Sequence, residues 1–221
     1  MTKSREDERA SEDPSAAPAP DGEHEPRTAE VTRETAETRV RVAVRLEGSG
    51  EAEVETGIGF FDHMLEQLAR HSLIDLEVEA EGDLEVDEHH TVEDVGLTLG
   101  RALSDALGER RGIRRYGFLL PMDDALARVA LDLGGRTHVE FRGEFDRERV
   151  GGLPTELVEE FVRSLARGLK ANVHVSVEYG RNDHHKIEAV FKALARSLRD
   201  AVDRDPRLGD ELPTTKGTLD S

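Results

Sequence analysis

Cysteine is absent from this sequence, and long apolar runs are absent as well. With no Cys among 221 residues, disulfides and thiolate metal ligands are excluded. Any metal ion would be held by histidine and carboxylate side chains, which favours Mn, Fe or Zn over soft metals. No run approaches the ~18 apolar residues that a transmembrane helix needs, and residues 1–20 have no apolar core typical of a secretory signal. We therefore expect a cytoplasmic protein with no membrane partner.

Positive charge is also scarce. Asp and Glu number 48 against 30 Lys and Arg, and the formal net charge is -18. Binding to nucleic acid requires a basic face, so we expect no nucleic-acid partner. Apolar residues make up only 36% of the chain. The length nevertheless suffices for one large domain, or two small ones, with a proper core.

The first segment differs in composition from the rest. Residues 1–27 are acidic and rich in Ala, Pro and Ser, and we expect them to form a disordered tail. Alternation of apolar and polar residues then predicts a strand over 40–46, and a Gly-rich turn followed by a strand over 51–55 indicates a hairpin. Helices are expected over 60–71 and 93–107, with a strand between them.

The second half of the chain repeats the plan of the first. A His-His-x-x-Glu motif occurs at 89–93 and again at 184–188, and the two sequences keep matching through the helix that follows each motif. The period is too long for a solenoid. We expect two repeats, residues 28–115 and 116–221, that form one catalytic unit. The expected fold class is α+β, with duplicated α/β half-domains, each a mostly antiparallel sheet with helices packed on one face.

The two motifs have the spacing of metal chelators. Positions i and i+4 share a helix face, so the first His and the Glu form a natural pair in each motif, His89 with Glu93 and His184 with Glu188. The middle histidine of each motif points about 100° away. It cannot easily join the same metal but can reach a second one. The duplication therefore predicts two metal ions, each taking a pair from one motif and the middle histidine of the other.

One further ligand per metal is expected from the helix before each motif. His63 is the candidate in the first half, and Glu160 occupies the matching position in the second half. A single His-His-x-x-Glu motif more often marks a solvated helix start than a metal site. Two copies with matched additional ligands favour the metal site. Mixed His and carboxylate ligation with room for substrate suits octahedral Mn or Fe better than closed tetrahedral Zn.

Five longer segments, in this order, resemble the imidazoleglycerol-phosphate dehydratase family from about Arg27 to Leu219. They are FFDHMLEQLARH, DEHHTVEDVGLTLGRAL, PMDDALARVALDLGGR, NDHHKIEAVFKALARSLR and PTTKG. The resemblance implies that imidazole-glycerol phosphate loses water to give imidazole-acetol phosphate in histidine biosynthesis. It implies two Mn(II) ions per active site that bind the substrate as imidazolate. It also implies a homo-oligomer of about 24 subunits with active sites at subunit interfaces.

The same resemblance assigns the metal ligands. One ion would take His63, His90, His184 and Glu188, and the other His89, Glu93, Glu160 and His185. In this assignment each ion takes the His/Glu pair of one motif and the middle histidine of the other, as the helical spacing suggests. Many relatives have His at the position of Glu160, and a carboxylate there should still bind Mn, a hard ion.

Catalytic and substrate-binding roles also follow from the resemblance. Glu37 is assigned proton transfer, with Glu188 as a second catalytic residue, although Glu37 alone would be interpreted as an ordinary exposed Glu. The substrate and its phosphate would be bound by Glu37, Gln67, His71, Arg115, Arg136, Lys192, Thr214, Thr215 and Lys216. The alternative for each cation is a surface charge, which we prefer for Arg115 taken alone.

Two other functions remain open from the residues. A different dinuclear metal-dependent phosphohydrolase would share the metal ligands and the phosphate cations but would release inorganic phosphate. A non-catalytic metal-binding or storage shell would have no need of Glu37, Arg136 or Lys216. His138 and His174 lie in strand-like segments and are interpreted as packed or surface histidines.

Overall fold

A computed structural model of the chain describes residues 25–215 and 217–219, with the side chains of 116–119 left out. Almost all of the predicted N-terminal tail, residues 1–27, therefore lies outside the described residues, and so does the predicted phosphate ligand Lys216. The described part is a mixture of four helices and three sheets.

The first sheet is formed by the first half of the chain. Its strands, in spatial order, are β1 (Thr28–Glu34), β2 (Thr38–Arg45), β4 (Asp75–Gly82) and β3 (Ala52–Glu55). In β2 the residues Val40, Val42 and Val44 are buried, while the residues between them are partly or fully exposed. One face of the sheet is therefore apolar and packs on the core, as the alternation predicts.

The predicted hairpin of residues 40–46 with 51–55 is wrong. β3 pairs in parallel with β4, while β2 pairs antiparallel with β1 and β4. Parallel strands need a crossover connection, and the helix α1 (Gly59–Ser72) supplies it. Asp75, the first residue of β4, holds the segment just before β3 in place, because its Oδ1 accepts backbone N–H groups from residues 49–51 at 2.7 to 3.1 Å.

The second sheet has the same arrangement. Its strands, in spatial order, are β5 (Tyr116–Met122), β6 (Ala125–Asp132), β10 (Asn172–Tyr179) and β7 (His138–Arg142). β7 is parallel to β10 and the other pairs are antiparallel, as in the first sheet. A short ribbon of β8 (Arg149–Val150) and β9 (Leu153–Pro154) precedes the third helix. The predicted boundary between repeats at residue 115 stays a prediction.

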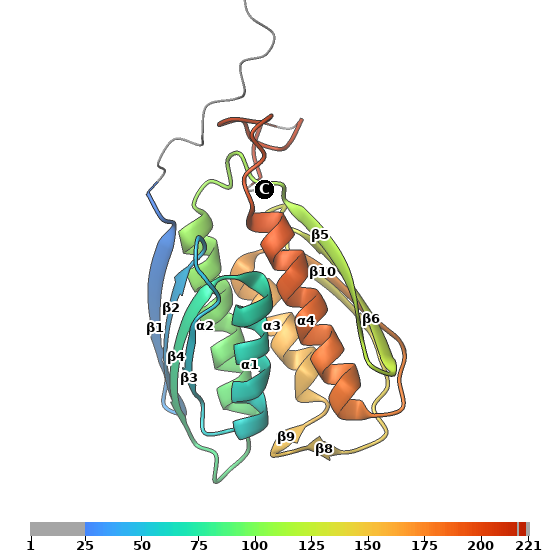
Figure 1. Ribbon diagram of the computed structural model, residues 1–221. Helices are drawn as coiled ribbons and strands as arrows, with labels where there is room; N and C mark the ends of the chain where they lie inside the picture. The colour runs from blue at the N-terminus through green and yellow to red at the C-terminus, as the bar shows by residue number, and fades with distance from the viewer. Residues whose placement is uncertain (1–24, 216, 220–221) are drawn as a thin grey trace, which may run out of the picture.

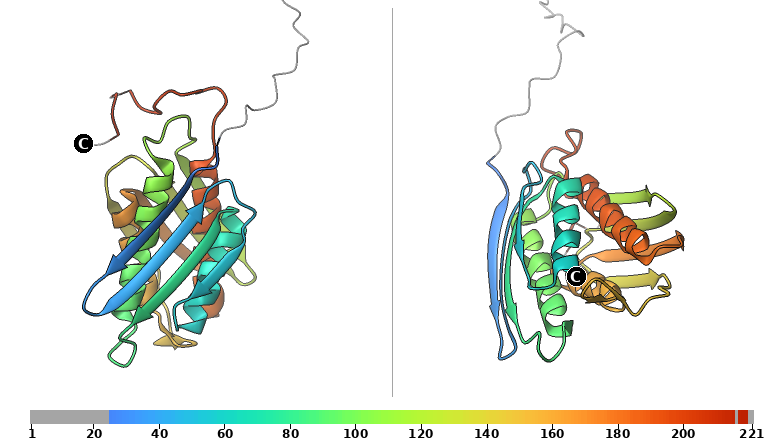
Figure 2. Two further views of the ribbon diagram at one scale, coloured as in Figure 1. Left: turned by 90° about the vertical axis from the view of Figure 1, so that its left-hand side faces the viewer. Right: turned by 60° about the horizontal axis from the view of Figure 1, so that its bottom comes forward.

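Four helices fill the space between the two sheets (Figures 1 and 2). They are α1 (Gly59–Ser72), α2 (His89–Leu107), α3 (Leu157–Leu169) and α4 (Asp183–Val202). α1 and α2 cover the inner face of the first sheet, and α3 and α4 that of the second. The α+β prediction, with helices on one face of each mostly antiparallel sheet, is confirmed.

The helices of the two layers meet in pairs, α1 with α4 and α2 with α3. Phe61 lies edge-on to Phe161, which stacks on Phe191, and all three are fully buried at the centre. α2 and α3 approach closely because both carry glycine at the crossing. A Cβ atom on Gly100 would lie 2.4 Å from the Leu165 carbonyl oxygen, and one on Gly168 would lie 2.4 Å from that of Leu97.

None of the helices in the described part of the chain combines the length and the apolar composition needed to cross a membrane.

Candidate metal centre

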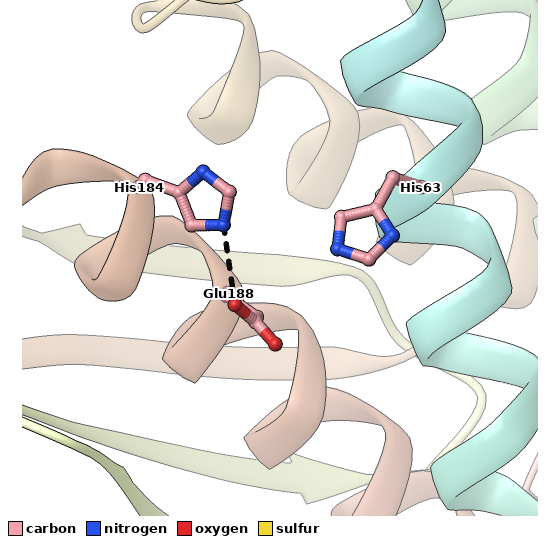
Figure 3. Close-up of side chains that lie close together, drawn as sticks. All are labelled: His63, His184 and Glu188. Carbon is pink, nitrogen blue, oxygen red and sulfur yellow. Dashed lines mark ion pairs between the residues drawn. The ribbon is translucent and has the colours of Figure 1, made fainter.

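The first two turns of α1 and of α4 bring predicted metal ligands from the two halves of the chain together. α4 begins at Asp183, directly before its motif, where the Asn182 side chain accepts the backbone N–H of His184 at 3.0 Å and caps the helix. His63 faces this turn from α1 (Figure 3). The contact between α1 and α4 thus joins residues that are far apart in the sequence.

His63, His184 and Glu188 form a compact cluster of possible ligands. One ligand atom from each lies within 4.8 Å of the other two. His184 Nε2 is 3.3 Å from Glu188 Oε2, and the rings of His63 and His184 are 6.3 Å apart (Figure 3). No other such group of three occurs among the described side chains. Two imidazoles and one carboxylate suit a divalent cation with open coordination positions.

The carboxylate of Glu188 is held in its charged form. Its side chain is almost fully buried, and Lys192 Nζ lies 2.6 Å from Oε1. Burial would raise the pKa of Glu188, but the hydrogen bond and charge of Lys192, with His184 and His63, outweigh burial, so the pKa lies below its usual value. A buried carboxylate that stays ionised is ready to bind a cation.

Three residues that the sequence assigns to substrate binding, Lys192, Gln67 and His71, lie close to this cluster. Gln67 Oε1 is 3.1 Å from His71 Nε2 on α1. Partial burial and the nearby charge of Lys192 lower the pKa of His71, which favours its neutral form. Gln67 and His71 follow His63 along α1, and Lys192 follows Glu188 along α4.

The second predicted set of ligands is less compact. The whole first motif is helical, because α2 begins at His89, earlier than the predicted start. His89 Nε2 lies 4.0 Å from Glu93 Oε2, and Glu93 also pairs with Arg167 on α3 at 3.4 Å. Glu160 accepts a hydrogen bond from the Ser164 hydroxyl at 3.0 Å. These three predicted ligands lie on the adjacent helices α2 and α3.

The middle histidine of each motif points away from the pair in its own motif, as the helical spacing predicts. His90 Nδ1 lies 3.1 Å from Asp83 Oδ2, and His185 Nδ1 is hydrogen-bonded to Asp124. The hydrogen bond that His90 donates to Asp83 raises the pKa of His90, and the one that His185 donates to Asp124 raises the pKa of His185. The structure thus brings together three of the four residues assigned to the first ion, and His90 is not among them.

Glu37 lies in the turn between β1 and β2 and is exposed. Its Oε2 is 3.8 Å from His90 Nδ1. The predicted proton-transfer residue is therefore a neighbour of a predicted metal ligand.

The predicted phosphate ligands come from several segments of the chain. Arg115 binds both carboxylate oxygens of Asp132, and its Nη1 donates to the Pro213 carbonyl at 2.9 Å. Arg115 thus holds the chain just before Thr214 and Thr215. Arg136 is exposed at the turn before β7.

Sequence reasoning gave no role to Asp83, Asp124 or Arg167, although each contacts a predicted ligand. Asp83 directly follows β4, and Asp124 lies in the turn between β5 and β6. An acidic residue in a turn is common without any site, so no local signal separates these two from the other carboxylates of an acidic chain.

The profile of one protein family, described as Imidazoleglycerol-phosphate dehydratase, matches residues 56–198. The Imidazoleglycerol-phosphate dehydratase of Cereibacter sphaeroides (strain KD131) is 55% identical over 194 residues, which are 87% of this chain and 100% of that protein. The Histidine biosynthesis bifunctional protein HisB of Stenotrophomonas maltophilia (strain R551-3) is 58% identical over 88% of this chain. This chain spans about half of that relative, since the match covers 53% of its length.

Two solved structures have the same fold. The imidazoleglycerol-phosphate dehydratase of Staphylococcus aureus aligns with a TM-score of 0.73 and 34% identity over 80% of this chain and 99% of that one. The Pyrococcus furiosus enzyme, solved in complex with (S)-C348, aligns with a TM-score of 0.73 and 35% identity over 85% of this chain and 99% of that one.

Proposed function

This chain belongs to the imidazoleglycerol-phosphate dehydratase family, and from that membership we propose that it converts imidazole-glycerol phosphate to imidazole-acetol phosphate and water. The observation that carries the proposal is the match along the whole length of the Cereibacter dehydratase. The reaction is a hydro-lyase step of histidine biosynthesis. A cytoplasmic location stays a prediction from the sequence.

We propose two Mn(II) ions as cofactors. The donor chemistry of the cluster fits such an ion, because it combines two imidazoles with a carboxylate that stays ionised despite burial. His63, His184 and Glu188 would hold one ion, and His89, Glu93 and Glu160 would contribute to the other. When bound, the ions would act as Lewis acids that stabilise the substrate ring as imidazolate.

The remaining ligand of each ion would be a middle histidine, His90 or His185, from another copy of the chain. In support, both side chains point away from the pairs in their own motifs, and His90 is absent from the cluster that holds the other residues assigned to its ion. A site shared between copies requires a homo-oligomer, and we propose an assembly of about 24 subunits with closed symmetry.

Other residues of the chain would transfer the proton and bind the substrate phosphate. Glu37, exposed beside His90, would move the proton between substrate carbon and hydroxyl. Lys192 keeps Glu188 ionised and correctly oriented. The substrate phosphate would be bound by Arg136, Lys192 and the Thr214–Thr215 segment, and Arg115 would position that segment through Pro213.

A reconstitution assay tests this proposal. The full chain is stripped with a chelator, and formation of imidazole-acetol phosphate is measured before and after Mn(II) is added back. We expect turnover only with Mn(II). Glu188→Gln should reduce it by more than the 10–100-fold typical for loss of a residue that only orients a ligand. Glu140→Gln, at the exposed outer face of the second sheet, is the matched control and should retain full activity.

Turnover that is unaffected by the chelator would contradict the metal centre, and absence of turnover with saturating Mn(II) would contradict the dehydratase activity.

A further inference from the structure

The middle histidines of the two motifs are held in the same way by carboxylates from outside the motifs. Each uses Nδ1, His90 with Asp83 at 3.1 and 3.2 Å and His185 with Asp124. In both cases Nε2 is left on the opposite edge of the imidazole ring. Because the same carboxylate contact on Nδ1 occurs in both halves of the chain, we expect it to serve the same purpose for both histidines.

Asp124 connects three segments. It lies in the turn between β5 and β6, where its neighbour Asp123 has a positive φ of 46°. Asp124 Oδ2 accepts the backbone N–H of Arg181 at 2.6 Å and that of Asn182 at 3.2 Å, directly before α4 begins. The other oxygen, Oδ1, binds His185. One carboxylate therefore fixes both the start of the helix and the ring that the helix carries.

Asp83 has the corresponding place in the first half of the chain. It follows the last residue of β4, and its backbone N–H donates to the Glu37 carbonyl oxygen at 3.2 Å. Its backbone carbonyl accepts the N–H of Val86 at 2.7 Å, which closes the turn leading to α2. The Asp83 backbone is thereby held against the turn between β1 and β2, while its carboxylate contacts the ring of His90.

A carboxylate on Nδ1 determines which ring nitrogen can bind a metal. When Nδ1–H donates to Asp83 or Asp124, the lone pair of the neutral imidazole is on Nε2. The carboxylate also fixes the plane of the ring and increases the basicity of Nε2. Partners of this kind, when removed, typically weaken metal affinity or activity by about 10–100-fold.

We propose that Asp83 and Asp124 are positioning residues that present Nε2 of His90 and His185 to Mn(II). Asp83 acts on the ion that His90 completes, and Asp124 on the ion that His185 completes. The inference rests on the proposed function, since it assumes the two Mn(II) sites.

The test is a titration of the chelator-treated full chain with Mn(II), with free Mn(II) measured by its electron paramagnetic resonance signal. The variants are Asp124→Asn, Asp124→Ala and Asp83→Asn, and Glu140→Gln is the control. For wild type we expect two ions per chain. Asp124→Ala should lower the affinity for one of the two ions by about 10–100-fold. Asp124→Asn should weaken it less, because the amide oxygen still accepts Nδ1–H.

A double Asp83→Asn, Asp124→Asn variant should bind both ions more weakly. If the two carboxylates served only in folding, the variants would have a lower thermal midpoint but would not show this graded loss of Mn(II) affinity. Two ions bound with wild-type affinity by all the Asp variants would overturn the inference and leave the proposed function intact. A wild-type chain that binds no Mn(II) would overturn the metal centre itself, and the positioning role with it.

Discussion

The buried ion pair between Lys186 and Asp183 should be one of the most sensitive points in the fold. Lys186 Nζ lies 2.9 Å from Asp183 Oδ1, and the two side chains are 8% and 1% exposed. Asp183 Oδ2 accepts the backbone N–H groups of residues 146 and 147 at 2.9 and 2.8 Å. The pair therefore holds the loop before β8 against the first turn of α4, next to His184.

Lys186→Met keeps most of the alkyl volume but leaves the Asp183 carboxylate buried without a cation. Breaking a buried pair in this way costs about 3–5 kcal/mol. We expect the lower end, about 3 kcal/mol, because the N-terminus of α4 still favours a negative charge there. The ion pair of Lys186 with Asp146 contributes little, since Asp146 is 83% exposed.

Urea unfolding at pH 7 and one fixed protein concentration measures this free energy. The double variant Lys186→Met, Asp183→Asn removes the uncompensated charge and keeps an oxygen acceptor for the loop. It should recover about half of the loss, which would appear as coupling in a double-mutant cycle. A single variant as stable as wild type, or a double variant less stable than the single one, would contradict this role of the ion pair.

Two further predictions concern stability. Burial raises the pKa of Asp75, but three backbone N–H groups and Arg45 outweigh it, so the folded pKa lies below its usual value. Its stabilising contribution is then present above the unfolded pKa of about 4 and is lost as pH falls through the folded pKa. Asp75→Asn should thus be less stable than wild type at pH 7, with a difference that shrinks in acid unfolding measurements; a pH-independent difference would contradict this. Gly100→Ala should destabilise the chain by about 1–3 kcal/mol in denaturant unfolding, because its Cβ would meet the backbone of α3, whereas Gly59→Ala, with nothing within 4 Å, should leave stability unchanged or slightly raised.

Local patterns in the sequence predicted the elements that depend on local periodicity. The alternation over residues 40–46 corresponds to the buried face of β2, and the helix expected over residues 60–71 corresponds to α1. Pairing of β3 was mispredicted, because a strand after a Gly-rich turn has the same local sequence whether it returns to its neighbour or crosses over a helix. Asp75, whose carboxylate binds the segment directly before β3, lies beyond that helix in the sequence.

The site was predictable to a similar extent. Repetition of the motif identified His184 and Glu188, and the matching helix position identified His63, which the structure brings together. The carboxylates on the middle histidines could not be found, because Asp124 meets His185 only through the pairing of β5, β6 and β10. Nothing local distinguishes it from the other acidic residues.

The most direct test of the dehydratase activity follows both possible fates of the phosphate in one sample. The full chain, loaded with Mn(II), is incubated with imidazole-glycerol phosphate and observed by phosphorus NMR. We expect the substrate resonance to be replaced by that of a new phosphate monoester, imidazole-acetol phosphate, with no inorganic phosphate formed. Growth of the inorganic phosphate signal in place of the new ester would contradict this expectation and would identify the chain as a phosphohydrolase.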